Sequence, residues 1–266
     1  MLEPRIIPCL LVHNKGLVKT VKFKDAKYVG DPINAVKIFN EKESDELMVL
    51  DIDATVQNRE PDYKMIENLA TECRMPLCYG GGIKTVEQAI KIFNLGVEKI
   101  AISSAAIEHP QLLSDISKEV GNQSVVVVID VKKKMFGGYD VYTHNGIKKT
   151  KIDLEKFISE LQSLGVGEIV MNSIDNDGVM KGYDLSLIEK VKPLIKVPMT
   201  VLGGAGSLND IKTLIEKFGI IGCASGSLFV FKGKYKAVLI NYPKSSDKYQ
   251  LFNTIYLTDI NKFNDE

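Results

Sequence analysis

The chain contains two similar segments, one in each half, and this repeat limits the possible folds more than any other feature. PLCYGGGIKTVEQAIKIFNLGVEKIAISSA, which begins at Pro76, parallels PMTVLGGAGSLNDIKTLIEKFGIIGCASGS, which begins at Pro198. Each copy contains a proline, an apolar run, a glycine pair, an amphipathic stretch, a second apolar run and a loop of small residues. RIIPCLLV likewise parallels VVVVIDV, and VLDIDATV parallels VMNSIDNDGV. Such halves are typical of a fused, two-fold architecture.

Short β-branched runs alternate along the chain with longer stretches whose apolar residues recur with a helical period. This alternation predicts parallel strands joined by helical crossovers. The expected strands are 5–11, 46–51, 76–79, 99–103, 124–130, 168–173, 198–202 and 220–224. The expected helices lie within 32–43, 85–95, 110–120, 153–164, 185–194 and 208–218, with capping signals at Asp31, Thr85, Asp184 and Ser207.

Eight strand–helix units are compatible with a closed barrel or with an open doubly wound sheet, and the repeat favours the barrel. We therefore predict an α/β fold, a (βα)₈ TIM barrel with a two-fold half-barrel repeat, in a single domain over residues 1–242. Residues 232–242 could form a final helix. Residues 243–266, rich in Lys, Asp, Asn and Ser, are expected to be a loosely packed tail.

The overall charge and the cysteines argue against several classes of function. The formal net charge is zero, so charge indicates neither a nucleic-acid nor a membrane partner. The start, MLEPRIIPCLLV, resembles neither a signal peptide nor a spanning segment, and we expect a cytoplasmic protein. The four cysteines and three histidines lack the spacing of metal ligands, so no metal and no cofactor is expected.

Glycines and serines follow four of the predicted strands, at the end of a barrel where active sites lie. Glycine allows backbone N–H groups to approach an anion closely, and serine hydroxyls could complete such a site. One loop of this kind could be no more than a tight turn, whereas two related copies predict a ligand with a phosphate at each end. The candidate phosphate-binding residues are Gly81, Gly82, Ser103, Ser104, Gly178, Gly203, Gly204, Gly226 and Ser227.

Acidic residues follow three strands at the same end. Asp130 and Asp177 are the candidate catalytic carboxylates, because a carboxylate at a barrel mouth can act as a general acid or base. For Asp51 and Asp175, bracing of a loop is as good an explanation as catalysis.

Four charged residues begin strands at the opposite end: Arg5, Glu46, Lys99 and Glu168. They could stabilise the floor of the barrel, which is the usual role of that face. Alternatively, they could gate a passage along the barrel axis.

These motifs together resemble the HisF family across residues 1 to about 231. The motifs are RIIPCL, GDP, DEL, LDI, the triple glycine, Asp130, SIDNDGVMKGYD and GGAG. The resemblance implies a HisH-like glutaminase docked on the amino-terminal face, with Glu98 as a docking residue. It also implies that ammonia passes a gate of the four charged residues to a ribonucleotide held by two phosphate sites. Lys19, which alone would be read as a solvated loop lysine, becomes a candidate catalytic residue that covers the substrate.

One departure from the family stands out. HisF proteins end strand one with an aspartate that pairs with the strand-five aspartate, whereas this chain has Leu11. Leucine cannot transfer a proton, so Leu11 marks a lost catalytic position. Smaller departures are Ser103 and Ser104 in a phosphate site, and Asn172 and Leu202 near the mouth.

Three functions follow from this combination. The first resembles HisF paralogues that, with a HisH-like glutaminase, supply ammonia to a separate amidotransferase that makes acetamidino sugars for surface polysaccharides. The second is an imidazole glycerol phosphate synthase cyclase subunit of histidine biosynthesis that tolerates Leu11. The third is a non-catalytic phosphate-binding scaffold. The isomerase relative HisA also uses paired acids, so Leu11 argues against it as well.

Overall fold

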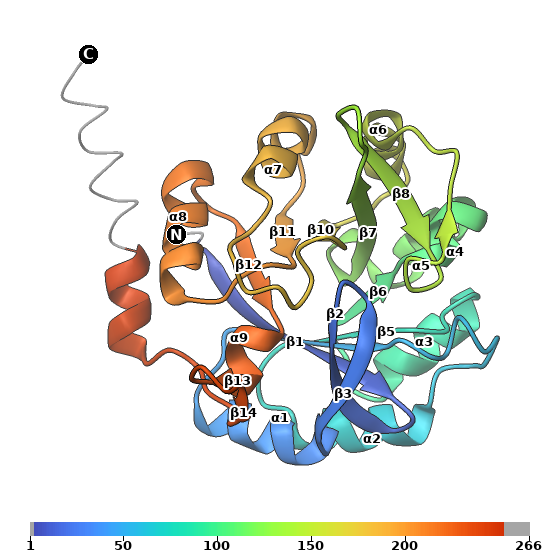
Figure 1. Cartoon of the computed structure of the whole chain (residues 1–266). Helices are drawn as coiled ribbons and strands as arrows, with labels where there is room; N and C mark the ends of the chain where they lie inside the picture. The colour runs from blue at the N-terminus through green and yellow to red at the C-terminus, as the bar shows by residue number, and fades with distance from the viewer. Residues whose placement is uncertain (1–2, 253–266) are drawn as a thin grey trace.

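The computed structural model describes residues 3–252 of the chain, which form a closed barrel of eight parallel strands (Figure 1). Neighbouring strands pair in the order β1–β4–β5–β6–β7–β10–β11–β12, and β12 pairs with β1 to close the ring. The barrel strands are β1 (Arg5–His13), β4 (Leu47–Asp51), β5 (Leu77–Gly80), β6 (Lys99–Ile102), β7 (Val125–Lys133), β10 (Glu168–Ser173), β11 (Met199–Leu202) and β12 (Gly222–Ser225). The predicted (βα)₈ barrel is therefore confirmed.

Helices follow the barrel strands and surround the sheet (Figure 1). Seven of them are seven to eleven residues long: α1 (Pro32–Glu41), α2 (Tyr63–Glu72), α3 (Val86–Asn94), α5 (Gln111–Val120), α6 (Leu154–Ser163), α7 (Leu185–Val191) and α8 (Leu208–Phe218). Two short helices, α4 (Ser104–Glu108) and α9 (Ser227–Val230), follow β6 and β12 directly. Two 3₁₀ turns, η1 (Asn122–Ser124) and η2 (Lys192–Leu194), follow α5 and α7, and residues 245–252 are also helical.

The predicted helix caps are confirmed. The side chains of Asp31, Thr85, Asp184 and Ser207 accept hydrogen bonds from backbone N–H groups in the first turns of α1, α3, α7 and α8. At α8 the cap is reciprocal, because the Asp210 carboxylate accepts a hydrogen bond from the Ser207 N–H. These bonds satisfy N–H groups that have no partner within a helix.

Three hairpins extend the fold beyond the barrel. After β1 come β2 (Gly16–Val21) and β3 (Lys24–Gly30), which form the β2–β3 hairpin. After β7 comes β8 (Tyr139–Thr143), which pairs with β7 in the β7–β8 hairpin and also with β9 (Lys148–Lys149). Lys19, expected to be a loop residue, is in β2, which pairs with both β1 and β3. The third hairpin consists of β13 (Phe231–Lys232) and β14 (Ala237–Val238).

The expected helix over 232–242 is wrong. Gly233 and Lys236 both have positive φ, at 73° and 49°, and the Lys236 N–H donates to the Gly233 carbonyl in the turn between β13 and β14. Repeated left-handed residues are incompatible with an α-helix.

The expectation of a loose tail is corrected for its described part. Residues 245–252 are helical, and Leu251 belongs to the buried core. Lys248 also forms an ion pair with Asp45 at 2.6 Å. The rest of the expected tail, 253–266, lies outside the described residues.

Two separate apolar cores hold the barrel together. The larger lies between the strands and the surrounding helices and includes Phe39, Tyr79 and Phe229. The smaller fills the inside of the barrel, with Ile7, Met48, Cys78, Ala101, Val126, Val128, Val170 and Ala224 among its buried members. The interior is thus a packed apolar layer that separates the two ends of the barrel.

Candidate active site

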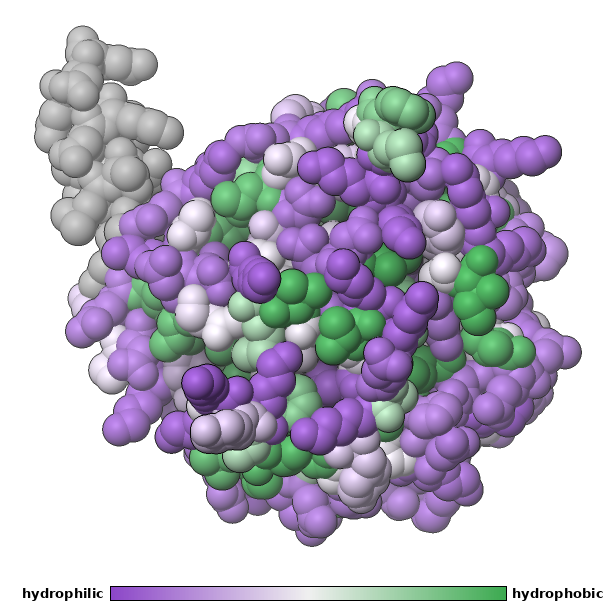
Figure 2. All heavy atoms as spheres, in the orientation of Figure 1, coloured by the Kyte–Doolittle hydropathy of each residue, from purple (hydrophilic) through white to green (hydrophobic). Residues whose placement is uncertain are grey.

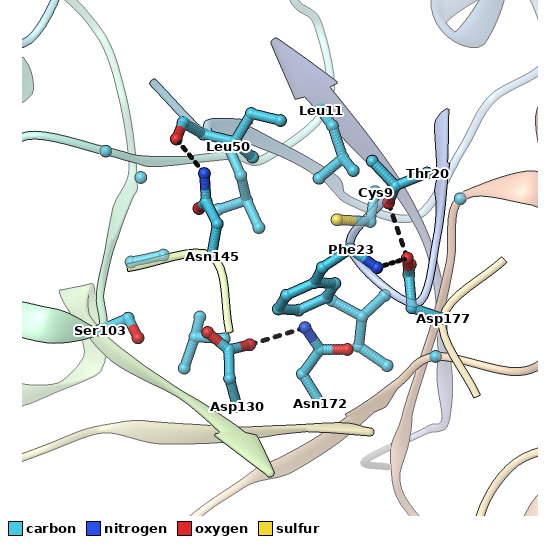
Figure 3. Close-up of a pocket in the computed structure, with 18 of the residues that line it drawn as sticks. Cys9, Leu11, Thr20, Phe23, Leu50, Ser103, Asp130, Asn145, Asn172 and Asp177 are labelled. Carbon is cyan, nitrogen blue, oxygen red and sulfur yellow. Dashed lines mark hydrogen bonds between the residues drawn. The ribbon is translucent and has the colours of Figure 1, made fainter. Parts of the chain in front are cut away.

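A cavity of about 160 Å³ lies at the carboxyl ends of the strands. Residues from all eight barrel strands or the loops that follow them line it, together with the β2–β3 hairpin and the turn after β8 (Figure 3). This is the end of a (βα)₈ barrel at which ligands bind.

Both glycine loops line this cavity, and both glycines of each loop have positive φ. Gly81 and Gly82 have φ values of 122° and 75°, and Gly203 and Gly204 have 93° and 119°. A Cβ at Gly81 would lie 2.4 Å from the Asp51 carbonyl oxygen, so no side chain fits there. The two-fold repeat therefore extends from the sequence to the backbone of the site.

The loops after β6 and β12 complete each half of the cavity lining. Ser103 and Ser104 stand beside the first glycine loop, and Gly226 and Ser227 stand beside the second. The geometry brings the predicted phosphate-binding residues, Gly178 included, to one cavity.

Lys19 lies at the second of these loops. It is on β2 and is only 5% exposed, so it is neither solvated nor in an open loop. Its Nζ donates to the Cys9 carbonyl oxygen at 2.5 Å, and a Cβ added to Gly226 would lie 2.4 Å from that Nζ. Burial lowers the pKa of Lys19. A cation is thus held beside the loop formed by Gly226 and Ser227.

Asp130 is a carboxylate with a strongly perturbed proton affinity. Burial raises its pKa to about 7, and repulsion from Asp177 contributes, while hydrogen bonds from Asn172 and Ser103 oppose the rise. Asn172 Nδ2 donates to Asp130 Oδ1 at 2.8 Å, whereas Asn172 Oδ1 is buried without a partner in residues 3–252. A group with this pKa can give or take a proton near neutral pH.

Leu11 lies across the cavity from Asp130 (Figure 3). It is level with Leu50 on the neighbouring strand, and both pack against the apolar layer inside the barrel. Leu202 and Val128 extend this apolar wall. The wall that faces Asp130 therefore contains no group at Leu11 that could exchange a proton.

Asp177 anchors the β2–β3 hairpin over the cavity. Its Oδ2 accepts hydrogen bonds from Thr20 Oγ1 at 2.6 Å and from the Phe23 N–H at 3.1 Å, and its carbonyl oxygen accepts from the Lys22 N–H. Burial raises the pKa of Asp177, against these hydrogen bonds. In this arrangement the Asp177 carboxylate, a candidate catalytic acid, is hydrogen-bonded to the hairpin (Figure 3).

The other acids at this end brace loops. Asp51 Oδ1 accepts hydrogen bonds from the N–H groups of Asp53 and Ala54 at 2.9 and 3.1 Å. Asp175 Oδ2 accepts from the Lys133 N–H at 2.8 Å. Their contacts match the bracing role that the sequence left open.

At the opposite end, the four charged residues of the strand starts form one ion cluster. Arg5 contacts Glu46 and lies 2.8 Å from Glu168, while Lys99 lies 3.0 and 2.9 Å from the same two glutamates. Thr200 Oγ1 donates to Glu168 at 2.6 Å. Burial would raise the pKa of Glu168, but the two cations lower it to about 2. Glu168 is therefore ionised, and the cluster joins residues of four strands at the base of the barrel.

Glu98 adjoins this cluster in sequence but takes no part in it. Its carboxylate accepts a hydrogen bond from the Leu77 N–H at 2.8 Å, and the residue is exposed at the same end of the barrel.

Sequence reasoning missed the side chains that cover the cavity. Thr20 and Phe23 come from the hairpin, and His144 and Asn145 from the turn after β8. Asn145 Nδ2 donates to the Ile52 carbonyl at 2.7 Å and so ties that turn to the loop after β4. The β-branched residues Val18, Thr20 and Val21 of GLVKTV were the available signal for the hairpin.

Within residues 3–252, no helix is long and apolar enough to cross a bilayer, and no three His, Cys, Asp or Glu residues gather as metal ligands would.

Comparison with known proteins identifies relatives along most of the chain. A family model described as "Histidine biosynthesis protein" matches residues 5–236. A Vibrio vulnificus protein named "Putative imidazole glycerol phosphate synthase subunit hisF3" is 61% identical, over 93% of this chain and 96% of that protein. A Pseudomonas aeruginosa protein named as a hisF2 subunit is 53% identical, over 91% and 97%. The Streptococcus sanguinis protein named "Imidazole glycerol phosphate synthase subunit HisF" is 40% identical, over 86% and 91%.

Proposed function

The chain belongs to the HisF family, and from this premise we propose that it is the barrel subunit of a glutamine amidotransferase system whose own cyclase chemistry is disabled. A HisH-like glutaminase docks on the amino-terminal face, with Glu98 among the docking residues, and releases ammonia into the barrel. The barrel passes this ammonia to a separate amidotransferase that forms an acetamidino sugar. The complex works in the cytoplasm.

The observation that carries this proposal is Leu11 opposite Asp130 in a barrel whose base cluster is complete. A general acid or base contributes about 10²–10⁴-fold to a rate, so one carboxylate cannot do the work of a pair. Glycine loops and Lys19 still provide for a phosphorylated small-molecule ligand, which would regulate or position the delivery of ammonia.

The barrel interior supports transport of a neutral molecule. Between the ion cluster and the cavity lie apolar side chains, including Met48, Cys78 and Val170. Ammonia crosses such a layer more readily than ammonium, because burial of an unpaired charge is costly. The contacts of Lys99 to Glu46 and Glu168 close the axis, so the lysine would have to shift for ammonia to enter.

A second candidate function is the cyclase reaction of histidine biosynthesis. The pKa of Asp130, raised by burial to about 7, and the two matching glycine loops favour it. In that case Asp130, Asp177 and Lys19 would act on the ribonucleotide without a partner at Leu11. Cyclisation near the rate of an ordinary HisF would support this candidate over the first.

Glutaminase coupling tests the proposal. Addition of the barrel, with ligand, to its HisH-like partner should raise glutamine hydrolysis, and Lys99→Ala should alter how much of the released ammonia reaches the bulk solution. A third candidate, a mere phosphate-binding scaffold, predicts no stimulation. Absence of stimulation by the unaltered barrel would refute the conduit.

A further inference from the structure

Exposed apolar side chains gather at one end of the molecule. Eleven large hydrophobic residues are exposed among the described residues. Six of them, Val21, Tyr28, Val56, Met135, Phe136 and Ile147, lie in segments that follow the carboxyl end of a barrel strand, and Tyr235, Val238 and Leu239 lie in or beside the β13–β14 hairpin. The most exposed are Met135 at 90%, Phe136 at 97% and Tyr235 at 91%. Figure 2 shows hydrophobic residues set among hydrophilic ones on the face that carries the β2–β3 and β13–β14 hairpins. Exposed apolar groups concentrated on one face indicate a surface that binds another molecule.

The same hairpins carry a concentration of positive charge. Each of the segments 22–27, 132–134 and 232–236 contains three exposed lysines, although the chain as a whole has no net charge. Among the described residues, Lys134 is the only one of these lysines in an ion pair, with Asp140 at 3.4 Å. The zero net charge of the chain therefore hides a local excess of positive charge on these hairpins. A binding partner that recognises lysines is thus compatible with the zero net charge.

Two of the hairpins are in contact and adjoin the cavity. Lys27 Nζ lies 5.3 Å from the ring centroid of Phe231, which joins β3 to β13. Thr20 and Phe23, from the first hairpin, line the cavity on their inner side. A molecule bound to the outer side of this hairpin would lie directly over the cavity mouth.

We propose that the β2–β3, β7–β8 and β13–β14 hairpins together form the docking surface for an acidic protein that consumes ammonia at the barrel mouth. The inference rests on the proposed function. A barrel that passes ammonia on without using it needs the enzyme that uses the ammonia to bind at the barrel mouth. Lysines complement acidic groups and speed association, while Met135, Phe136 and Tyr235 supply the apolar contacts that dominate binding energy.

A protein explains this surface better than a nucleic acid does. The aliphatic residues Val238 and Leu239 are 45% and 51% exposed, and Met135 forms the tip of its hairpin. Aliphatic side chains match the apolar centre of a protein interface, whereas single-stranded nucleic acid selects aromatic platforms between cations.

The test measures binding of the barrel–glutaminase complex to the acidic amidotransferase that consumes its ammonia. Met135→Ser with Phe136→Ser should weaken the Kd at least about tenfold. Replacement of Lys232, Lys234 and Lys236 by serine should weaken it similarly and reduce its dependence on NaCl. Tyr249→Ser is the matched control, because Tyr249 is 69% exposed away from the hairpins, and it should leave the Kd unchanged.

No binding by the unaltered complex, or equal Kd values for all variants, would overturn the docking surface. Tighter binding of a single-stranded oligonucleotide than of the enzyme would also overturn it. Glutaminase stimulation is measured on the same variants and should stay unchanged, because none of the altered residues belongs to the base cluster of Arg5, Glu46, Lys99 and Glu168. If glutaminase stimulation is intact and the variants bind the enzyme as tightly as the unaltered complex does, only the docking surface is refuted. If the unaltered complex shows no glutaminase stimulation, the proposed function is refuted.

Discussion

The base and the mouth of the barrel are built from the same eight strands, yet they differ in how far they keep the pattern of the family. At the base, Arg5 and Lys99 each contact both Glu46 and Glu168. At the mouth, Asp130 faces Leu11, the position at which the resemblance to HisF implies a second carboxylate. An apolar layer separates the two ends. The difference teaches that the base and the mouth occupy separate layers of side chains, so one can change while the other is retained.

The first prediction breaks the base. Glu168→Gln leaves Arg5 and Lys99 with a single carboxylate, and loss of one partner from a buried ion cluster costs about 3–5 kcal/mol. Urea denaturation measures the free energy of unfolding. Glu189→Gln is the control, because its pair with Lys217 is half exposed, and it should change stability by less than about 0.5 kcal/mol. Equal effects would show that the base cluster contributes no more than a surface pair.

The second prediction repairs the mouth. Leu11→Asp places a carboxylate opposite Asp130 and should raise cyclisation with ammonium salt by about 10²-fold. Leu50→Asp is the control, since Leu50 lies level with Leu11 on the next strand and packs against the same apolar layer. An equal gain from both substitutions would indicate a general polarity effect rather than a restored pair.

The third prediction concerns pH. Since burial raises the pKa of Asp130 to about 7 from the ordinary aspartate value of 3.8, the native state binds this proton more tightly than the unfolded chain does. Below about pH 4, Asp130 is protonated in both states and does not lower the free energy of unfolding. Between about pH 4 and pH 7 it ionises in the unfolded chain but stays protonated in the native state, so the free energy of unfolding falls as the pH rises. Asp130→Asn should remove this loss, which amounts to about 4 kcal/mol between pH 4 and 8. Parallel stability curves for both proteins across this range would contradict the raised pKa.

The smallest effect is expected at the hairpin. Thr20→Val removes the hydroxyl that bonds to Asp177 and should cost about 1 kcal/mol, with faster amide exchange over residues 16–30. Thr71→Val is the control, because the Thr71 hydroxyl bonds to a carbonyl on an exposed helix. If exchange over the hairpin is unchanged, the contact with Asp177 does not hold it over the cavity.

The repeat and the alternation of patterns were sufficient to predict the barrel. Strand ends, helix caps and glycine loops depend on residues that are close in the sequence, so they can be predicted from it. The capping box of Ser207 and Asp210 at the start of α8 is an example. The hairpins were not predicted, because their lysine-rich segments resemble loops and their strands depend on pairing with neighbours. The turn at Gly233 and Lys236 replaced the expected helix for the same reason.

The candidate site was predicted in its membership but not in its contacts. Position at a strand end was enough to bring Asp130, Asp177 and the glycines together. The sequence could not show that Asp177 binds the hairpin or that Lys19 is buried against the Cys9 carbonyl, because both contacts join segments whose approach depends on the folded hairpin.

Cyclisation of the ribonucleotide by the unaltered chain with saturating ammonium salt tests the central claim most directly. Measured beside the Streptococcus sanguinis HisF relative, turnover should be lower by at least about 10²-fold, because Leu11 supplies no proton transfer opposite Asp130. Turnover equal to that of the relative would contradict the account.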